Sequence, residues 1–152
     1  MTTIRKQIVT ALPMDEAFAY IADFANSAEW DPGVETAERM NDGAVGVGAR
    51  YRLTVVMGGR TAPMEYEITR HEPSDRVVLD GSGSGVTAVD DIGFAATPDG
   101  TVIDYTATIQ LGGLLRLVQP FMGKTFAGIG ERAADGMKRT LDERALQRRD
   151  GR

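Results

Sequence analysis

The chain has 152 residues, no cysteine and a formal net charge of −5. This length fits one domain with its own core, the mild acidity argues against nucleic acid as a partner, and the missing cysteines exclude disulfides and thiolate metal sites. Because the N-terminus lacks a secretory signal and no apolar stretch approaches the roughly 20 residues that span a bilayer, we expect a cytoplasmic protein without stable membrane insertion.

The beginning of the chain predicts one strand followed by two short helices. Residues 3–10 form the strand, with Ile4 and Ile8 on one side. Pro13 suits the first turn of a helix, and the residues after it recur at helical spacing on one apolar side: Ala17, Phe18, Ile21 and Phe24. A second short helix follows and ends in the Trp-Asp-Pro-Gly turn at residues 30–33.

Four later stretches alternate apolar and polar residues with a period of two, which is typical of half-buried strands. Hairpin turns at residues 58–59 and 98–100 connect these stretches in two pairs, and residues 77–81 add a strand whose inner face is ambiguous. The predicted inner face is rich in bulky or flexible side chains: Tyr51, Leu53, Val55, Met57, Met64, Tyr66, Ile68, Val86, Ala88, Asp90, Ile92, Phe94, Ile103, Tyr105, Ala107 and Ile109.

The opposite faces of these strands indicate their register. Arg50 and Arg52 on one strand can pair with Glu65 and Glu67 on the next. His71 shares the parity of the two glutamates, so we expect it on the outer face. It is the only histidine, which excludes a zinc site built from histidines and leaves no inner-face imidazole for a catalytic triad.

The C-terminal part predicts a long amphipathic helix. Residues 114–118 form one helical turn, and Pro120 either starts or kinks the helix. Gly123 and Gly130 lie at the edge of its apolar stripe, where they either allow close approach to the sheet or soften the helix. The stripe itself consists of Met122, Phe126, Ile129, Ala133, Met137 and Leu141.

Asp90 is the one charged residue on the predicted inner face, where an unpaired carboxylate is costly. One explanation is a hydrogen bond from Tyr66 or Tyr105, or a position near the wet mouth of a cavity. The other is a carboxylate with a raised pKa that accepts a ligand hydroxyl or moves a proton.

Two segments resemble nucleotide-binding motifs but do not predict a nucleotide site. The GKT at 123–125 lacks the P-loop glycine, and the Gly-Ser repeat at 81–85 is typical of a flexible turn.

Several segments together resemble the SRPBCC superfamily, which includes START lipid-transfer domains, pathogenesis-related ligand binders and polyketide cyclase/dehydrase-like proteins. They are LPMDEAF at 12–18, IADF at 21–24, EWDPGV at 29–34, GVGARY at 46–51, YEI at 66–68, EP at 72–73 and DDIGF at 90–94. The resemblance implies an α+β helix-grip fold, in which a curved antiparallel sheet of about seven strands wraps around a long C-terminal helix and two short helices follow strand 1. We expect one SRPBCC-like ligand-binding domain at residues 1–146 and a frayed or disordered tail at 147–152.

The resemblance also implies a hydrophobic cavity between the sheet and the last helix. The candidate ligand-binding residues lie on the inner face, on the helical stripe and near the early helices: Phe24, Trp30, Tyr51, Leu53, Val55, Met57, Met64, Tyr66, Ile68, Ala88, Asp90, Ile92, Phe94, Tyr105, Ala107, Met122, Phe126, Ile129, Ala133 and Met137. Asp90 is the only catalytic candidate, and neither a cofactor nor a metal is indicated.

Three functions stay open, because one fold hosts carriers, cyclases and regulatory domains. The leading hypothesis is a carrier or binder of a small hydrophobic or amphipathic molecule, such as a lipid, sterol or polyketide, acting as a monomer or homodimer. The second is a polyketide cyclase/dehydrase-like enzyme with Asp90 as general base. The third is a regulatory or chaperone-like module that binds a protein partner.

Overall fold

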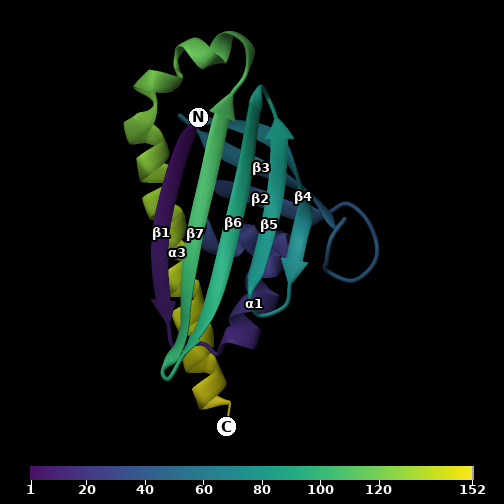
Figure 1. The fold of residues 1–152 in the computed structure, drawn as a ribbon, viewed down its shortest axis with the longest axis vertical. Helices are drawn as coiled ribbons and strands as arrows, with labels where there is room; N and C mark the ends of the chain where they lie inside the picture. The colour runs from purple at the N-terminus through teal and green to yellow at the C-terminus, as the bar shows by residue number, and fades with distance from the viewer. Residues whose placement is uncertain (152) are drawn as a thin grey trace.

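A single antiparallel sheet and one long helix dominate the computed structural model, which describes residues 1–151 (Figure 1). The strands are β1 (Thr2–Thr10), β2 (Val34–Arg39), β3 (Arg50–Met57), β4 (Arg60–Glu72), β5 (Arg76–Gly83), β6 (Val86–Thr97) and β7 (Gly100–Leu111). The helices are α1 (Met14–Ala22), α2 (Ser27–Trp30) and α3 (Gly123–Asp150), with short 3-10 segments η1 (Phe24–Asn26), η2 (Gly113–Leu117) and η3 (Gln119–Phe121).

The sheet has the strand order β1-β7-β6-β5-β4-β3-β2, and every neighbouring pair is antiparallel. Figure 1 shows α3 running along one face of this sheet, with α1 near the same face. The two short helices sit between β1 and β2 in the chain, although these strands lie at opposite edges of the sheet. The α+β helix-grip prediction is therefore confirmed.

The hairpin register agrees with the charge pattern of the sequence. Arg50 lies opposite Glu67 and Arg52 lies opposite Glu65 in the β3–β4 pair. Their side chains form exposed ion pairs, including one of 3.1 Å between Arg50 and Glu65. Exposed pairs of this kind add little stability each, but they place the charged face outward and the apolar face toward α3.

The prediction that His71 lies on the outer face is wrong. A bulge between Ile68 and Arg70 shifts the β4 register, so that His71 lies opposite the buried Val77. Its ring packs edge-on against Phe18 of α1, with ring centroids 5.2 Å apart. One extra residue in a strand exchanges the two faces for everything after it, and simple parity does not reveal this.

The prediction of a turn at residues 81–85 is wrong for its first part, because β5 continues to Gly83. Gly81 is buried in the strand, directly under the ring of Tyr66, and a Cβ atom at this position would collide with that ring. The glycine therefore lets Tyr66 lie flat against β5. Ser84 and Gly85, both with positive φ, form the turn itself.

Glycines bring α3 into direct contact with the rest of the fold. Gly130 packs on Ile4 of β1, and Gly136 packs on the backbone carbonyl of Trp30 at the end of α2. Of the two glycines expected either to allow close approach or to soften the helix, Gly130 allows close approach to the sheet. Gly123 does not, because nothing lies within 4 Å of a Cβ atom built there. A side chain at either contact point would force the helix away from its neighbours.

The helix α3 continues to Asp150, past the boundary expected at residue 146. Near its end, the Arg148 Nε donates a hydrogen bond of 2.6 Å to Glu16 Oε1 of α1. This interaction ties residue 148 to the domain, in contrast to the frayed tail expected at 147–152. Residue 152 lies outside the described residues.

The connection from β7 to α3 consists of two 3-10 segments rather than the single helical turn expected, and Pro120 belongs to η3 instead of starting or kinking α3. Gln119 anchors this connection, because its amide donates to Ile109 O and its Oε1 accepts from Leu111 N, both at 3.0 Å. Leu114 and Phe121 beside it are exposed. None of the helices within residues 1–151 has the length and apolarity required to cross a membrane.

Candidate functional site

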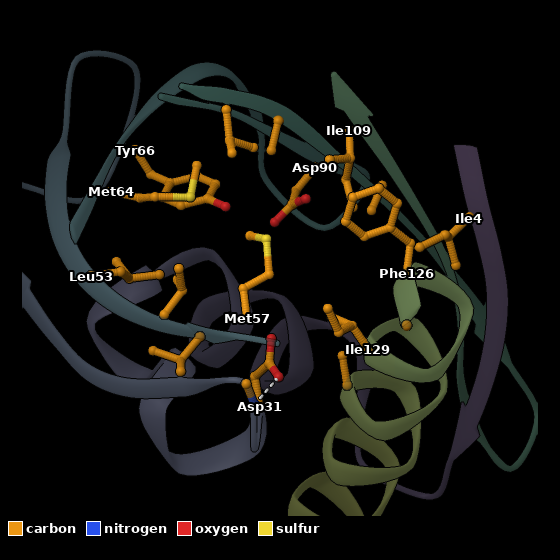
Figure 2. Close-up of a pocket in the computed structure, with 18 of the residues that line it drawn as sticks. Ile4, Asp31, Leu53, Met57, Met64, Tyr66, Asp90, Ile109, Phe126 and Ile129 are labelled. Atoms are coloured by element: carbon orange, nitrogen blue, oxygen red, sulfur yellow. Dashed lines mark hydrogen bonds between the residues drawn. The ribbon is translucent and has the colours of Figure 1, made fainter. Parts of the chain in front are cut away.

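A cavity of about 90 Å³ lies between the inner face of the sheet and α3 (Figure 2). One buried water needs roughly 10–15 Å³ on this scale, so the space exceeds that of a single solvent molecule. The strands β3, β4, β6 and β7 form its walls, and α3 closes it on one side. The strands whose inner faces were predicted from the sequence therefore border a cavity.

Most of the residues predicted to bind a ligand line this cavity. They are Phe24, Leu53, Val55, Met57, Met64, Tyr66, Ala88, Asp90, Tyr105, Ala107, Phe126, Ile129 and Ala133. Each comes from the inner face of a strand, from the buried side of α3, or from η1 beside α2. The structure thus brings these side chains together, while their contact with a ligand stays a prediction.

Other members of the predicted set do not line the cavity: Trp30, Tyr51, Ile68, Ile92, Phe94, Met122 and Met137. Except for Met122, which precedes α3 and is half-buried, they are core residues. Phe94 illustrates the reason, because it packs against Phe18 of α1 with ring centroids 5.1 Å apart. Residues of α1 and η1 pack against part of the inner face of the sheet. A residue that alternation predicts to point inward can therefore lie in the packed core and not line the cavity.

Asp90 lies on β6 with its carboxylate in the cavity, and the residue is only 6% exposed. Burial raises the pKa of this carboxyl from 3.8 to about 7; a hydrogen bond with Tyr105 lowers it, and the charge of Asp31 raises it further. Asp90 thus interacts with a tyrosine and also has a raised pKa, while a role in accepting a ligand hydroxyl or moving a proton stays a prediction. Near neutral pH it is able to gain or lose a proton.

Asp31 is a second cavity carboxylate that the sequence reasoning missed. It follows α2, and its Oδ1 accepts a hydrogen bond of 2.8 Å from Gly33 N, which is typical of an Asp that closes its own turn. Burial raises its pKa to about 6, whereas the Gly33 hydrogen bond and the charge of Arg132 lower it. The sequence around Asp31 indicates only a helix-ending turn, and no strand parity places it inward.

Figure 2 shows Asp90 and Asp31 on different walls of the cavity, with the sulfur of Met57 between them. Met57 is the last residue of β3 and only half-buried, and the two glycines after it, Gly58 and Gly59, both have positive φ. A methionine side chain is unbranched and flexible, so Met57 can move aside more easily than a branched residue. The volume available to a ligand therefore depends on the rotamer of Met57.

Tyr66 and Tyr105 add two hydroxyl groups to the cavity wall. Burial raises the pKa of each well above its usual value, and the charges of Asp90 and Asp31 raise both further. Both tyrosines therefore stay neutral hydrogen-bond donors at any physiological pH. Figure 2 shows the Tyr66 hydroxyl pointing into the cavity on the side of Asp90.

Asp90 and Asp31 are the only ionised side chains among the described residues that line the cavity. Among residues 1–151, the side chains lining it include no Lys, Arg or His. Arg132 on α3 influences Asp31 but is itself exposed and does not line the cavity. In the same part of the chain, no group of three or more His, Asp or Glu side chains is arranged to hold a metal ion.

An open antiparallel sheet, a long C-terminal helix and an internal cavity between them define a START-like helix-grip protein. The chain belongs to the family described as polyketide cyclase/dehydrase and lipid transport, which matches residues 1–142. This agrees with the SRPBCC resemblance of the sequence. A search of curated proteins found no match.

Solved structures of low sequence identity share the fold. A START superfamily protein from Mycobacterium smegmatis is 15% identical with a TM-score of 0.75, and the match covers 93% of this chain and 97% of that one. The protein TTHA0849 from Thermus thermophilus is 18% identical with a TM-score of 0.74, covering 96% and 98%. The Zhui aromatase/cyclase from Streptomyces sp. R1128 is 14% identical with a TM-score of 0.72, covering 97% and 94%. These likenesses concern the fold alone.

Proposed function

We propose that this protein binds one small, mostly apolar molecule in the cavity between the sheet and α3. The observation that carries the proposal is an internal space with apolar walls and a few convergent polar groups, which is the usual composition of a small-molecule site. The family description, which includes lipid transport, supports the same function.

The walls provide both affinity and orientation. Apolar burial contributes roughly 25 cal/mol per Å² of ligand surface removed from water. Asp90 and Asp31 lie on different walls, and Tyr66 adds a hydroxyl, so these groups can hydrogen-bond to a polar end of the ligand while the other walls are apolar. An amphipathic molecule therefore fits better than a pure hydrocarbon.

Native mass spectrometry and thermal shift with a panel of small apolar and amphipathic compounds test this proposal. A bound ligand stabilises the native state by RT ln(1 + L/Kd), where L is the free ligand concentration, so the melting temperature rises as L exceeds Kd. The variant Ala107→Phe fills the cavity from β7, and Ala95→Phe places the same ring on the exposed side of β6 as a control. We expect binding to be lost in the first variant and kept in the second. Equal binding by both variants, or no binding by the unmodified protein, contradicts the proposal.

A second candidate function is acid–base catalysis of the cyclase type, which the pair of cavity carboxylates favours. With pKa values of about 6 and about 7, one carboxyl of the pair can be ionised while the other is protonated near neutral pH. The ionised group removes a proton from a carbon next to a carbonyl, that carbon attacks a second carbonyl, and the protonated group donates its proton to the new alkoxide. The sum of these transfers needs no oxidant or reductant.

Separate measurements of binding and turnover distinguish the two candidates. With a short poly-β-ketone substrate, an enzyme loses turnover in Asp90→Asn and keeps its affinity for the cyclised product within a few-fold. A binder shows no turnover above the buffer rate in either protein. Faster cyclisation by the unmodified protein that persists in Asp90→Asn contradicts the role of this carboxylate.

A further inference from the structure

The acidic character of the cavity restricts the kind of ligand that it can accept. Two carboxylates and two tyrosine hydroxyls line the space, and no cationic side chain among residues 1–151 lines it with them. Arg132, the charged group on α3 that influences Asp31, is exposed to solvent. A carboxylate or phosphate ligand would therefore bring a third negative charge into an apolar space that already holds two acidic groups.

The polar groups of the cavity are also left with unused hydrogen-bonding capacity. Tyr66 is 8% exposed, and no group within residues 1–151 is seen to hydrogen-bond to its hydroxyl. Asp90, at 6% exposed, interacts with the Tyr105 hydroxyl, which leaves most of its acceptor positions free. The Asp90 carboxylate and the Tyr66 hydroxyl both point into the cavity, and the carboxylate, as an acceptor, suits a ligand with hydrogen-bond donors.

We infer that the cavity selects an apolar organic cation, such as a protonated primary or secondary amine on an aromatic or aliphatic body, with the ammonium group between Asp90 and Asp31 after the flexible Met57 side chain has moved aside. This inference rests on the proposed binding function and names the ligand class for it. The ammonium group supplies N–H donors to both carboxylates, and the apolar body contacts the walls that Leu53, Ile129 and Phe126 provide. The cation also supplies the positive charge that the protein itself does not place there.

Proton release is a second consequence of this arrangement. The groups that face the ammonium position are Asp90 from β6, Asp31 from the turn after α2, Tyr66 from β4 and Tyr105 from β7, with Arg132 acting on Asp31 from α3. A bound cation favours the ionised form of each carboxyl and so lowers both pKa values from about 6 and about 7. Binding near pH 6.5 therefore expels protons from the protein.

Three probes of nearly equal size test the inference: benzylammonium, benzyl alcohol and benzoate, compared by titration calorimetry at about pH 8 and about pH 5. We expect benzylammonium to bind about tenfold more tightly than benzyl alcohol at the higher pH, and benzoate to bind least. At the lower pH the carboxyls are protonated, so the preference for the cation shrinks. Calorimetry at about pH 6.5 in buffers of different ionisation enthalpy should detect proton release when benzylammonium binds, and none when benzyl alcohol or benzoate binds.

Variants assign the preference to the two carboxylates. The double variant Asp31→Asn/Asp90→Asn should bind benzyl alcohol and lose the preference for benzylammonium, while Asp80→Asn on the exposed side of β5 should retain it. The titrations are repeated with the Met57→Ala variant, in which the centre of the cavity is free for all three probes. If the double variant does not fold, the pH and proton-release measurements on the unmodified protein decide the matter.

The outcomes separate this inference from the proposed function. Benzyl alcohol or benzoate binding as tightly as benzylammonium at about pH 8 overturns the inference and leaves the proposed function standing. If none of the probes binds the unmodified protein or Met57→Ala, the proposed function fails and the inference fails with it. A preference for the cation that persists in the double variant also overturns the inference, because the carboxylates would not be its cause.

Discussion

Replacing Asp90 by asparagine removes an ionisable group from the cavity and keeps a side chain of almost the same shape. Burial holds the pKa of Asp90 at about 7 in the folded protein, against 3.8 for an ordinary aspartate. Well below pH 3.8 the carboxyl is protonated in both the folded and the unfolded chain, so it does not affect the free energy of unfolding. As the pH rises toward 7, only the unfolded chain ionises freely, and the folded state loses relative stability.

The pKa difference determines the size of this effect. Each unit corresponds to 1.36 kcal/mol, so the full loss between about pH 4 and about pH 8 is about 4 kcal/mol. The Asp90→Asn variant does not ionise and escapes this loss. We therefore expect it to match the unmodified protein at about pH 4, and to be more stable by up to about 4 kcal/mol at about pH 8.

Urea unfolding followed by circular dichroism measures the difference in the free energy of unfolding at each pH. Asp80→Asn, an exposed carboxylate on β5, is the control for removing a negative charge from an acidic protein. Because each variant is compared with the unmodified chain at the same pH, the other titrating groups largely cancel. A difference that stays constant from about pH 4 to about pH 8, or equals that of the control, refutes the conclusion that burial raises the pKa of Asp90.

Four further substitutions test the packing around the cavity and of α3. Gly136→Ala places a methyl group against the carbonyl of Trp30 and should lower the free energy of unfolding by about 3 kcal/mol. Gly128→Ala is the matched control, because its methyl group meets only the end of a flexible arginine side chain, and it should raise the free energy of unfolding by up to about 1 kcal/mol. Urea unfolding measures both values. Met57→Ala should increase the affinity for ligands larger than benzene, measured by calorimetry, and unchanged size selectivity would contradict its central position. Gly81→Ala should push the aromatic ring above it into the cavity, so that it lowers both ligand affinity and melting temperature; normal affinity would contradict the contact.

The sequence predicted the fold and most of the cavity wall because both depend on strand periodicity. Inward residues such as Leu53, Met64 and Ala107 recur every second position, and β3, β4, β6 and β7 keep their register where these residues lie. Asp90 was recognised because it interrupts an apolar series on one face. Regular alternation is a local property, so it can be read without knowing the tertiary contacts.

The failures concern features that depend on distant parts of the chain. His71 changes face because of a bulge two positions earlier, and Gly81 stays in the strand because the ring of Tyr66 covers it. Asp31 was missed because the turn sequence at residues 30–33 already accounts for it, and in the structure its Oδ1 does accept a hydrogen bond from Gly33 N. Only the approach of the sheet and of α3 to that turn shows that its carboxylate also lines the cavity.

The contact of Gly136 with the carbonyl of Trp30 lets the backbone of α3 lie directly against the end of α2. Gly130 meets the side chain of Ile4, whereas Gly136 meets the backbone carbonyl of Trp30, so no change of rotamer can relieve the contact at Gly136. A larger residue at either glycine would push α3 away from these neighbours. The sheet side, where Met57 and Leu53 project inward, offers the positions at which the capacity for larger guests can be engineered while the spacing between helix and sheet stays constant.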